Sequence, residues 1–331
     1  MLNQSDLSAL NKNDRVDHFL LVKKIESRLT KSNKPYLFLE LGDKSASLNA
    51  NIWDNFDEVS SSIFTGDIAK VIGVIEDYQG ARQIRLNSIR KLTSSEEVSS
   101  IDFLPRSKRN LNVMISEFTK RIEKIKEPYL KQLLKQIFDD ENLKKFATAP
   151  AGKSWHHSYL HGLIEHTLEI IKICDLMCDI HPEINRDLLI TGAMMHDFGK
   201  TAELSFNSSF DYTDKGKLLG HIVISAMMIN EEVKKIPGFP EETKECLLHL
   251  ILSHQGRLEY ASPVVPKTLE AITLYQADEL SAKVNAYKNA ILSQVNSESG
   301  WTKFINLAST DLFKHSLTPD KDDEINKSLF D

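Results

Sequence analysis

The feature that most constrains this chain is the stretch Met194–Lys200, where a run of apolar helical residues ends in an adjacent histidine and aspartate. Two ionisable side chains that leave the end of a buried helix can turn toward one point inside the protein. Their imidazole and carboxylate groups suit a borderline or hard divalent cation. Gly199 and Lys200 follow directly, and the lysine can hold an anion. The stretch therefore predicts a buried metal site with a cationic residue beside it.

Length, charge and cysteine content limit the kinds of protein this chain can be. With 331 residues, of which 41% are apolar, we expect two or three domains with substantial cores. The formal net charge of -6 argues against a surface that coats nucleic acid, although a local basic groove remains open. The N-terminus has no signal-peptide pattern, and no apolar run approaches the roughly 20 residues of a membrane span. We therefore expect no membrane partner. Because three cysteines cannot form a closed disulfide set, we also expect reduced thiols and a cytoplasmic protein.

The segment from Arg15 to Leu92 has the pattern of short strands separated by turns. In Pro35–Leu41 the three leucines fall on one face, and Tyr36 and Phe38 fall on the other. The next strand alternates in the same way and is closed by Trp53, and two further strands follow. Five strands of this length resemble an OB-fold β-barrel, whose second and third strands commonly bind single-stranded nucleic acid or oligosaccharide.

Tyr36, Phe38 and Trp53 are the candidate substrate-binding residues of this barrel. Stacking aromatic rings among basic side chains suit sequence-tolerant binding of single strands. The nearby cations are Lys23, Lys24, Arg28, Lys31, Lys34, Arg82, Arg85 and Arg90. In the alternative interpretation, the aromatic face only packs on another domain. We predict a nucleic-acid-binding OB-fold over residues 12–95, with single-stranded RNA or DNA as its partner.

After the barrel, the apolar residues recur at helical spacing. We assign residues 96–150 to a helical linker that contains a basic amphipathic helix, 151–315 to an all-α bundle, and 316–331 to a polar tail. Nine of the 11 histidines, all except His18 and His315, lie between residues 156 and 254 of this bundle. Apolar residues in its last part, such as Trp301 and Phe304, leave room for a homo-oligomer.

Six ligating groups are expected to point inward from five helices of this bundle. They are His166, His196, Asp197, His221, His254 and Asp278. Burying unpaired carboxylates is costly, and no Lys or Arg lies on the same helix faces to pair with them. A shared cation explains the set, and six ligands exceed the four of an ordinary zinc site, which favours two divalent ions. Oxygen and nitrogen ligands around paired ions favour Mn²⁺.

The order of these residues resembles the HD-domain superfamily of metal-dependent phosphohydrolases. His166 looks like the first ligand, the pair His196 and Asp197 like the signature, and Asp278 like the last ligand. An OB-fold ahead of such a bundle resembles the YhaM-type 3'-5' exoribonucleases. The resemblance implies a metal-dependent hydrolase that removes nucleoside 5'-monophosphates from the 3' end of RNA, and it leaves single-stranded DNA open as a second substrate.

This resemblance also assigns roles to individual residues. His166, His196, Asp197 and Asp278 would hold a first ion, and Asp197 would bridge to a second ion held by His221 and His254. Asp197 and Lys200 are the expected catalytic residues, with Lys200 neutralising a phosphate oxygen.

Three further residues are expected to contact the substrate. Gln255 can hydrogen-bond a phosphate, and His156 or His157 can contact one, although both histidines could equally be surface residues at a loop-to-helix junction. Two other functions stay open. The protein could hydrolyse small nucleotides, or it could bind single strands without catalysis.

Overall fold

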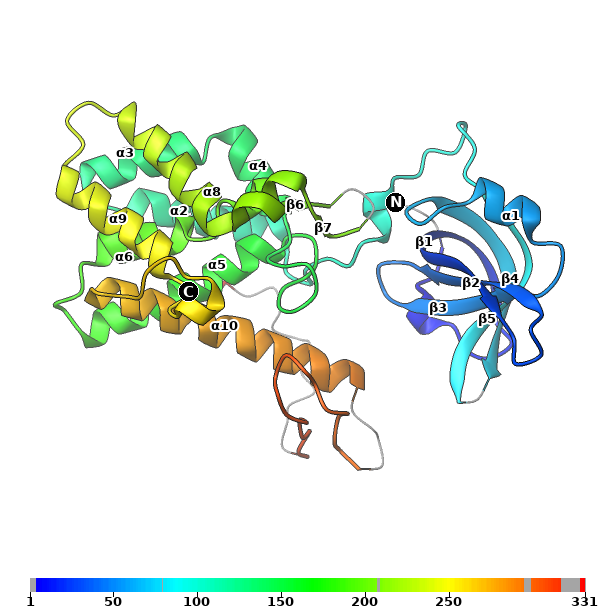
Figure 1. Ribbon diagram of the computed structural model, residues 1–331. Coiled ribbons are helices and arrows are strands. Elements are labelled where there is room, and N and C mark those ends of the chain that lie inside the picture. The colour runs from blue at the N-terminus through cyan, green and yellow to red at the C-terminus, as the bar shows by residue number, and fades with distance from the viewer. Residues whose placement is uncertain (1–3, 79, 207–208, 295–298, 317–327, 331) are drawn as a thin grey trace. The chain divides into compact units, whose positions relative to one another are not determined.

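The computed structural model describes residues 4–78, 80–206, 209–294, 299–316 and 328–330. The chain divides into two compact units (Figure 1). One unit comprises Met1–Arg106 with Phe206–Ser209, and the other comprises Ser107–Ser205 with Phe210–Asp331.

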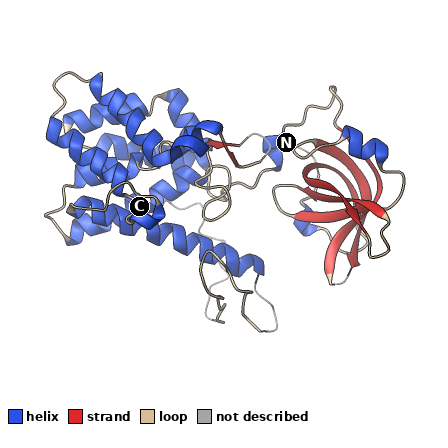
Figure 2. Cartoon of the chain, in the orientation of Figure 1, coloured by secondary structure: helices blue, strands red, loops and turns tan. Residues whose placement is uncertain are grey.

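The first unit contains a closed β-barrel, whose strands are drawn in red in Figure 2. Its five strands follow the order β1-β2-β3-β5-β4 around the barrel. The strands are β1 (Arg15–Leu29), β2 (Pro35–Gly42), β3 (Ser47–Ile52), β4 (Ile68–Tyr78) and β5 (Ala81–Lys91). The long strand β1 pairs with β4 through its first half and with β2 through its second half, across a bulge between Val22 and Lys24. β3 and β5 run parallel and close the barrel. This architecture confirms the predicted five-stranded OB-fold.

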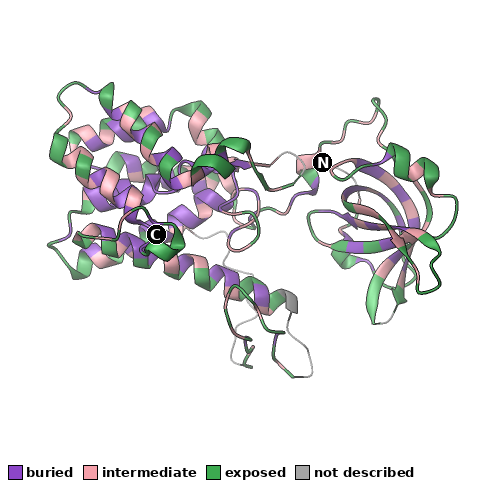
Figure 3. Cartoon of the chain, viewed as in Figure 1, coloured by how far each residue is buried: buried purple, intermediate pink, exposed green. Residues whose placement is uncertain are grey.

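The alternation seen in the sequence sets the two faces of the barrel. Leu37, Leu39 and Leu41 of β2 are buried in its core, together with Leu48 and Ala50 of β3. Apart from Gly42, which is buried at the end of β2, their neighbours along the same strands are half-buried or exposed, as the alternating colours of Figure 3 show. The short helix α1 (Asp57–Ser62) was not predicted from the sequence, because it has no buried residue to give it a helical apolar pattern.

The second unit is a helical bundle, as predicted. Its helices are α2 (Leu111–Lys124), α3 (Pro128–Ile137), α4 (Asp140–Thr148), α5 (Gly162–Ile180), α6 (Arg186–Met195), α7 (Lys200–Glu203), α8 (Asp214–Lys234), α9 (Glu241–Ser253) and α10 (Leu269–Gln294). The helix α5 is apolar on most sides and packs against α2, α4, α6 and α10. A small hairpin of β6 (Leu204–Ser205) and β7 (Asp211–Tyr212) follows α7.

The helices α2, α3 and α4 fall in the segment assigned from the sequence to a linker. In the structure they pack against α5, α6 and α8 of the bundle. Phe118 and Phe146 are fully buried there, each in an edge-on contact with Phe138. Side-chain caps fix where several helices begin: Asn110 caps α2, Asp139 caps α4 and Asn185 caps α6.

Among the described residues, none of the helices combines the length and the apolar character that a membrane span requires.

Candidate metal centre

Five helices of the bundle bring the six predicted ligands to one place. His166 comes from α5, His196 and Asp197 from the end of α6, His221 from α8, His254 from the end of α9, and Asp278 from α10. All are buried except His221, whose side chain is 19% exposed. Asp197 lies at the centre, within 4 Å of all four histidines.

The spacing of the ligand atoms fits shared coordination. The Nε2 atom of His196 lies 3.2 Å from Asp197 Oδ2, and the Nε2 atoms of His221 and His254 lie 3.3 and 3.6 Å from Asp197 Oδ1. His166 Nε2 lies 3.0 Å from Asp278 Oδ1. Ligand atoms held about 2.0–2.2 Å from one ion are separated by roughly 3.0–3.5 Å at ordinary coordination angles. The side chains therefore stand where ligands of a common ion would stand.

Four buried atoms in this cluster have no hydrogen-bond partner among the described residues: His196 Nε2, His221 Nε2, His254 Nε2 and Asp197 Oδ1. Leaving a buried polar atom without a partner costs free energy, so such atoms call for a ligand. The residues form two groups that could each hold an ion: His166, His196 and Asp197, and Asp197, His221 and His254. The chemistry and geometry of the donor set thus fit divalent cations, with Asp197 common to both groups.

Backbone carbonyls orient two of the histidines. His196 Nδ1 donates to Ala193 O at 2.8 Å, and His254 Nδ1 donates to Ile251 O at 2.7 Å. Both histidines sit at a helix C-terminus, where carbonyl oxygens of the last turn lack helical partners. Because a carbonyl can only accept, each proton is on Nδ1, and the Nε2 lone pair is left facing the cluster.

Side chains orient the other two histidines. Ser281 Oγ donates to Glu169 Oε2 at 2.6 Å, so its hydroxyl accepts the Nδ1 proton of His166 at 3.0 Å. Glu203 Oε1 accepts both the Nδ1 proton and the backbone N–H of His221, at 3.1 and 2.9 Å. Glu169, Glu203 and Ser281 were not among the residues predicted from the sequence. They carry no local signal, because only the packing of α5 on α10 and of α7 on α8 brings them to the histidines.

A kink in α8 makes the contact with Glu203 possible. Gly220 has φ +70°, a left-handed conformation that glycine adopts without steric cost, and it interrupts the helix. The backbone N–H of His221 is therefore free to donate to Glu203. Gly199 lies close by, and a Cβ added there would stand 2.3 Å from His221 O. The contact between α7 and α8 thus requires a residue without a side chain at position 199.

Lys200 corrects one step of the sequence argument, which found no cation on the inward helix faces. It lies outside those faces, at the start of α7, yet it is buried and its Nζ stands 2.6 Å from Asp197 Oδ2. Burial disfavours the charge of Asp197, but the Lys200 ammonium and His196 hold the pKa of this carboxyl well below its usual value. Burial likewise opposes ionisation of Asp278, and His166 outweighs it, so the pKa of Asp278 is lowered. Both carboxylates are ionised at neutral pH.

The two neighbouring histidines have different surroundings. His157 is fully buried, with Nε2 3.3 Å from Glu169 Oε1 and its backbone N–H donated to Asn285 Oδ1, so it is not the surface residue of the alternative interpretation. His156 is partly exposed and lines a cavity, with its ring 4.9 Å from that of His166. Burial of its ring nitrogens, reinforced by His166, lowers the pKa of His156 well below 6.5 and keeps it neutral.

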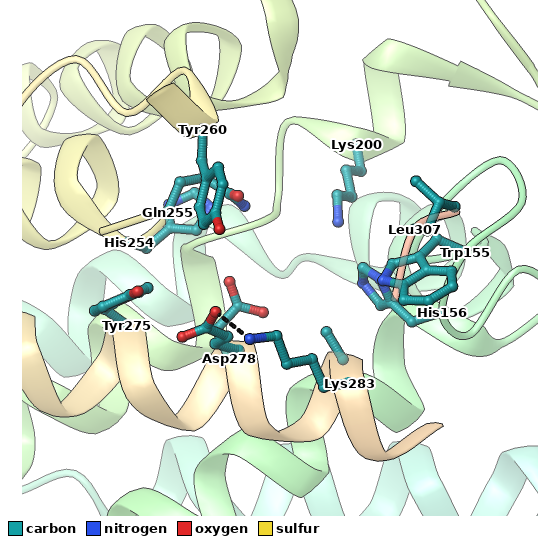
Figure 4. A pocket seen from close by; sticks show the side chains of 12 residues that line it. Trp155, His156, Lys200, His254, Gln255, Tyr260, Tyr275, Asp278, Lys283 and Leu307 are labelled. Atoms are coloured by element: carbon teal, nitrogen blue, oxygen red, sulfur yellow. Dashed lines mark hydrogen bonds and ion pairs between the residues drawn. The ribbon is translucent and has the colours of Figure 1, made fainter. Parts of the chain in front are cut away.

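The cavity opens onto the cluster and has a volume of about 400 Å³. It is lined by Trp155, His156, Lys200, His254, Gln255, Tyr260, Tyr275, Asp278, Glu279, Ala282, Lys283 and Leu307 (Figure 4). Five of the predicted site residues of the bundle therefore share one cavity: His156, Lys200, His254, Gln255 and Asp278. Gly256 shapes its wall, because a Cβ at this position would stand 2.3 Å from the ring of Tyr275.

The predicted aromatic residues of the barrel form two separate features. Tyr36 and Trp53 stack on each other, with ring centroids 4.8 Å apart and planes at 28°. Trp53 is 57% exposed. The Arg28 guanidinium lies 3.6 Å from the ring centroid of Phe38 and covers it. The outer face of β2 and β3 thus offers one open aromatic pair beside a cation-covered ring.

Comparison with known proteins supports the fold assignment of both units. The model of the HD domain matches residues 163–283, and the model of the OB-fold nucleic acid binding domain matches residues 21–92. The second OB-fold domain of replication protein A from Methanococcus maripaludis covers 28% of this chain at 20% identity with a TM-score of 0.21, a likeness too weak to bear on function.

Relatives with known names span both units. The 3'-5' exoribonuclease YhaM of Geobacillus sp. is 33% identical over 278 residues, 84% of this chain and 85% of the relative. That of Bacillus subtilis is 34% identical over 282 residues, 84% and 88% of the two chains, and that of Listeria monocytogenes is 35% identical over 279 residues, 82% and 86%. With identity of this level over most of both chains, the protein belongs to the family of the 3'-5' exoribonuclease YhaM.

Proposed function

We propose that this protein is a metal-dependent 3'-5' exoribonuclease that removes nucleoside 5'-monophosphates from single-stranded RNA. The observation that carries the proposal is the convergence of four histidines and two aspartates on one buried cluster that opens into a cavity. Family membership supports the choice of substrate and direction, because the relatives are named 3'-5' exoribonucleases.

Two divalent ions, with Mn²⁺ as the preferred metal, match the donor set. His166, His196, Asp197 and Asp278 would hold one ion, and Asp197, His221 and His254 would hold the other. When bound, paired ions of this kind would lower the pKa of a water and stabilise charge on the attacking and leaving oxygens of a phosphodiester. Nitrogen and carboxylate oxygen ligands without cysteine suit Mn²⁺ better than a closed structural zinc site.

The reaction breaks the bond between phosphorus and the 3' oxygen of the penultimate nucleotide. The water oxygen becomes a phosphate oxygen of the released nucleoside 5'-monophosphate, and the shortened strand keeps a 3' hydroxyl. Lys200 is charged at neutral pH, because Asp197 raises its pKa against the effect of burial. Its ammonium lines the cavity and can neutralise a non-bridging phosphate oxygen.

Two uncharged side chains complete the phosphate environment. Gln255 presents an amide to the cavity, and His156 presents a neutral imidazole. Either can donate a hydrogen bond to a phosphate oxygen without changing its protonation state. Both therefore act as binding residues, whereas buried His157 supports the site through its contact with Glu169.

The barrel would hold the strand through base stacking. The open pair of Tyr36 and Trp53 offers a ring face to any base, and Arg28 over Phe38 adds positive charge beside it. Such contacts are tolerant of sequence, which suits an enzyme that moves along RNA. The bases of single-stranded DNA can stack on the same aromatic pair.

A time course with end-labelled single-stranded RNA tests the proposal. The wild-type protein with Mn²⁺ should release single nucleotides from the 3' end. Addition of a metal chelator, or the substitution Asp197→Ala, should abolish this release. Metal content measured on the same samples should fall in the variant. If RNA stays intact while free nucleotides are hydrolysed, the protein is a small-nucleotide phosphohydrolase. If neither RNA nor free nucleotides are hydrolysed but RNA binds, the protein is a non-catalytic single-strand binding protein.

A further inference from the structure

The cavity beside the metal cluster has walls that phosphate hydrolysis alone does not require. Trp155 and Leu307 lie on one side of it, and Tyr260 lies on the opposite side (Figure 4). Tyr275 and Ala282 add apolar surface from α10. Water and a phosphate need no aromatic surface, so these walls indicate that a larger group with flat apolar faces enters the cavity.

The size of the cavity limits that group. Its volume of about 400 Å³ lies in the lower part of the range of about 300–1,000 Å³ found for small-molecule sites. A single nucleotide is a ligand of this class, whereas an extended strand needs a groove. The cavity therefore suits one nucleotide at a time.

The charges are placed for the same ligand. Lys200 and the ligands His254 and Asp278 give the cavity a polar side that can hold a phosphate next to the metal cluster. Trp155 precedes His156 in the chain, and the ring of His156 lies 4.9 Å from that of His166. The aromatic wall thus begins directly beside the groups that handle the phosphate, as the short span from a phosphate to its base requires.

We propose that this cavity binds the 3'-terminal nucleotide of the strand, with its base stacked on Trp155 and Tyr260 facing it from the opposite wall. The phosphate of that nucleotide lies at Lys200 and the metal cluster. The inference rests on the proposed exonuclease function and names the subsite that makes the enzyme cut one nucleotide from an end. It also makes a nucleoside 5'-monophosphate, the product, a ligand of the same cavity.

Calorimetric titration of the full-length, Mn²⁺-loaded protein tests this assignment with AMP, ribose 5-phosphate and inorganic phosphate as probes. Loss of one stacked base contact changes affinity by about 5- to 160-fold, so AMP should bind more tightly than ribose 5-phosphate by that factor. Trp155→Ala should reduce AMP affinity to the level of ribose 5-phosphate and leave ribose 5-phosphate binding unchanged. Trp155→Phe keeps a stacking ring and should retain most of the affinity.

Trp301→Ala is the matched control, because Trp301 is 47% exposed, packs on Phe313 and does not line the cavity. It should bind AMP as the wild type does. Circular dichroism of each variant reports folding, and Tyr260→Ala tests the opposite wall if Trp155→Ala fails to fold. Equal binding of AMP and ribose 5-phosphate to the wild type, or unchanged AMP affinity in folded Trp155→Ala, would overturn the inference.

The same variants separate this inference from the exonuclease function. If the wild type degrades RNA from the 3' end while the Trp155 and Tyr260 variants keep full AMP affinity, the terminal base lies elsewhere and only the subsite is wrong. If AMP binding depends on Trp155 but RNA is never shortened, the cavity is a mononucleotide site and the exonuclease function fails.

Discussion

Glu203 and Ser281 each support one histidine, and replacing them should separate the two proposed ions. Glu203 accepts the Nδ1 proton and the backbone N–H of His221, which belongs to the group formed with His254 and Asp197. Ser281 accepts the Nδ1 proton of His166, which belongs to the other group. Glu203→Ala should therefore lower the affinity of the protein for one ion, and Ser281→Ala should lower its affinity for the other.

The expected loss of metal affinity depends on how many hydrogen bonds each side chain accepts and on whether that side chain is charged. Losing the partner of a metal-ligating histidine lowers metal affinity by about 10- to 100-fold, which equals about 1.4–2.7 kcal/mol. Glu203 supplies a charged acceptor for two bonds, and bonds to charged groups are roughly twice as strong as neutral ones. We expect a loss near 100-fold for Glu203→Ala and near 10-fold for Ser281→Ala, whose hydroxyl is neutral.

The assay is calorimetric titration of metal-free protein with Mn²⁺, fitted to two affinities. Glu231→Ala is the matched control, because it also removes one carboxylate, but from an exposed pair with Lys234 on α8. It should leave both affinities unchanged. The reasoning is refuted if Glu203→Ala leaves both Mn²⁺ affinities unchanged, as Glu231→Ala should. It is also refuted if Glu203→Ala and Ser281→Ala lower the same one of the two affinities.

Three further predictions concern other parts of the molecule. Trp53→Ala should weaken binding of single-stranded RNA by about 1–3 kcal/mol with unchanged melting, because Trp53 is 57% exposed; fluorescence anisotropy measures this, and unchanged affinity would exclude stacking there. Gly192→Ala should lower the free energy of unfolding by about 1–3 kcal/mol in urea denaturation, because the added Cβ would stand 2.4 Å from Leu250 Cδ2; equal stability would show that the core can yield. Burial lowers the pKa of His156 below its unfolded value of 6.5, so on acidification the unfolded state takes up the proton first and stability falls. In metal-free protein His156→Gln should reduce this fall by up to about 1.4 kcal/mol per pH unit below about pH 6.5, as followed by thermal melting, and an identical pH profile would contradict the assignment.

Much of the fold follows from the sequence by itself. The alternation in Pro35–Leu41 places its leucines in the barrel core, because successive side chains of a strand point to opposite faces. Helical spacing placed His166 and Asp278 on inward faces, because residues three or four apart share one side of a helix. The adjacent His196 and Asp197 marked the metal cluster, since few other arrangements justify such a pair at the end of an apolar helix.

Tertiary structure alone decided which side chains support that cluster. Glu203 and Ser281 stand 18 and 115 residues from the histidines they hold, and no periodicity links positions that are joined only by packing. The burial of Lys200 against Asp197 and the cavity walls from Trp155 and Tyr260 likewise arise where separate segments meet. Sequence patterns report the environment of a residue along its own helix or strand, so they identified the ligands. Contacts between elements depend on how those elements pack, and only the folded chain shows which residues orient the ligands and shape the cavity.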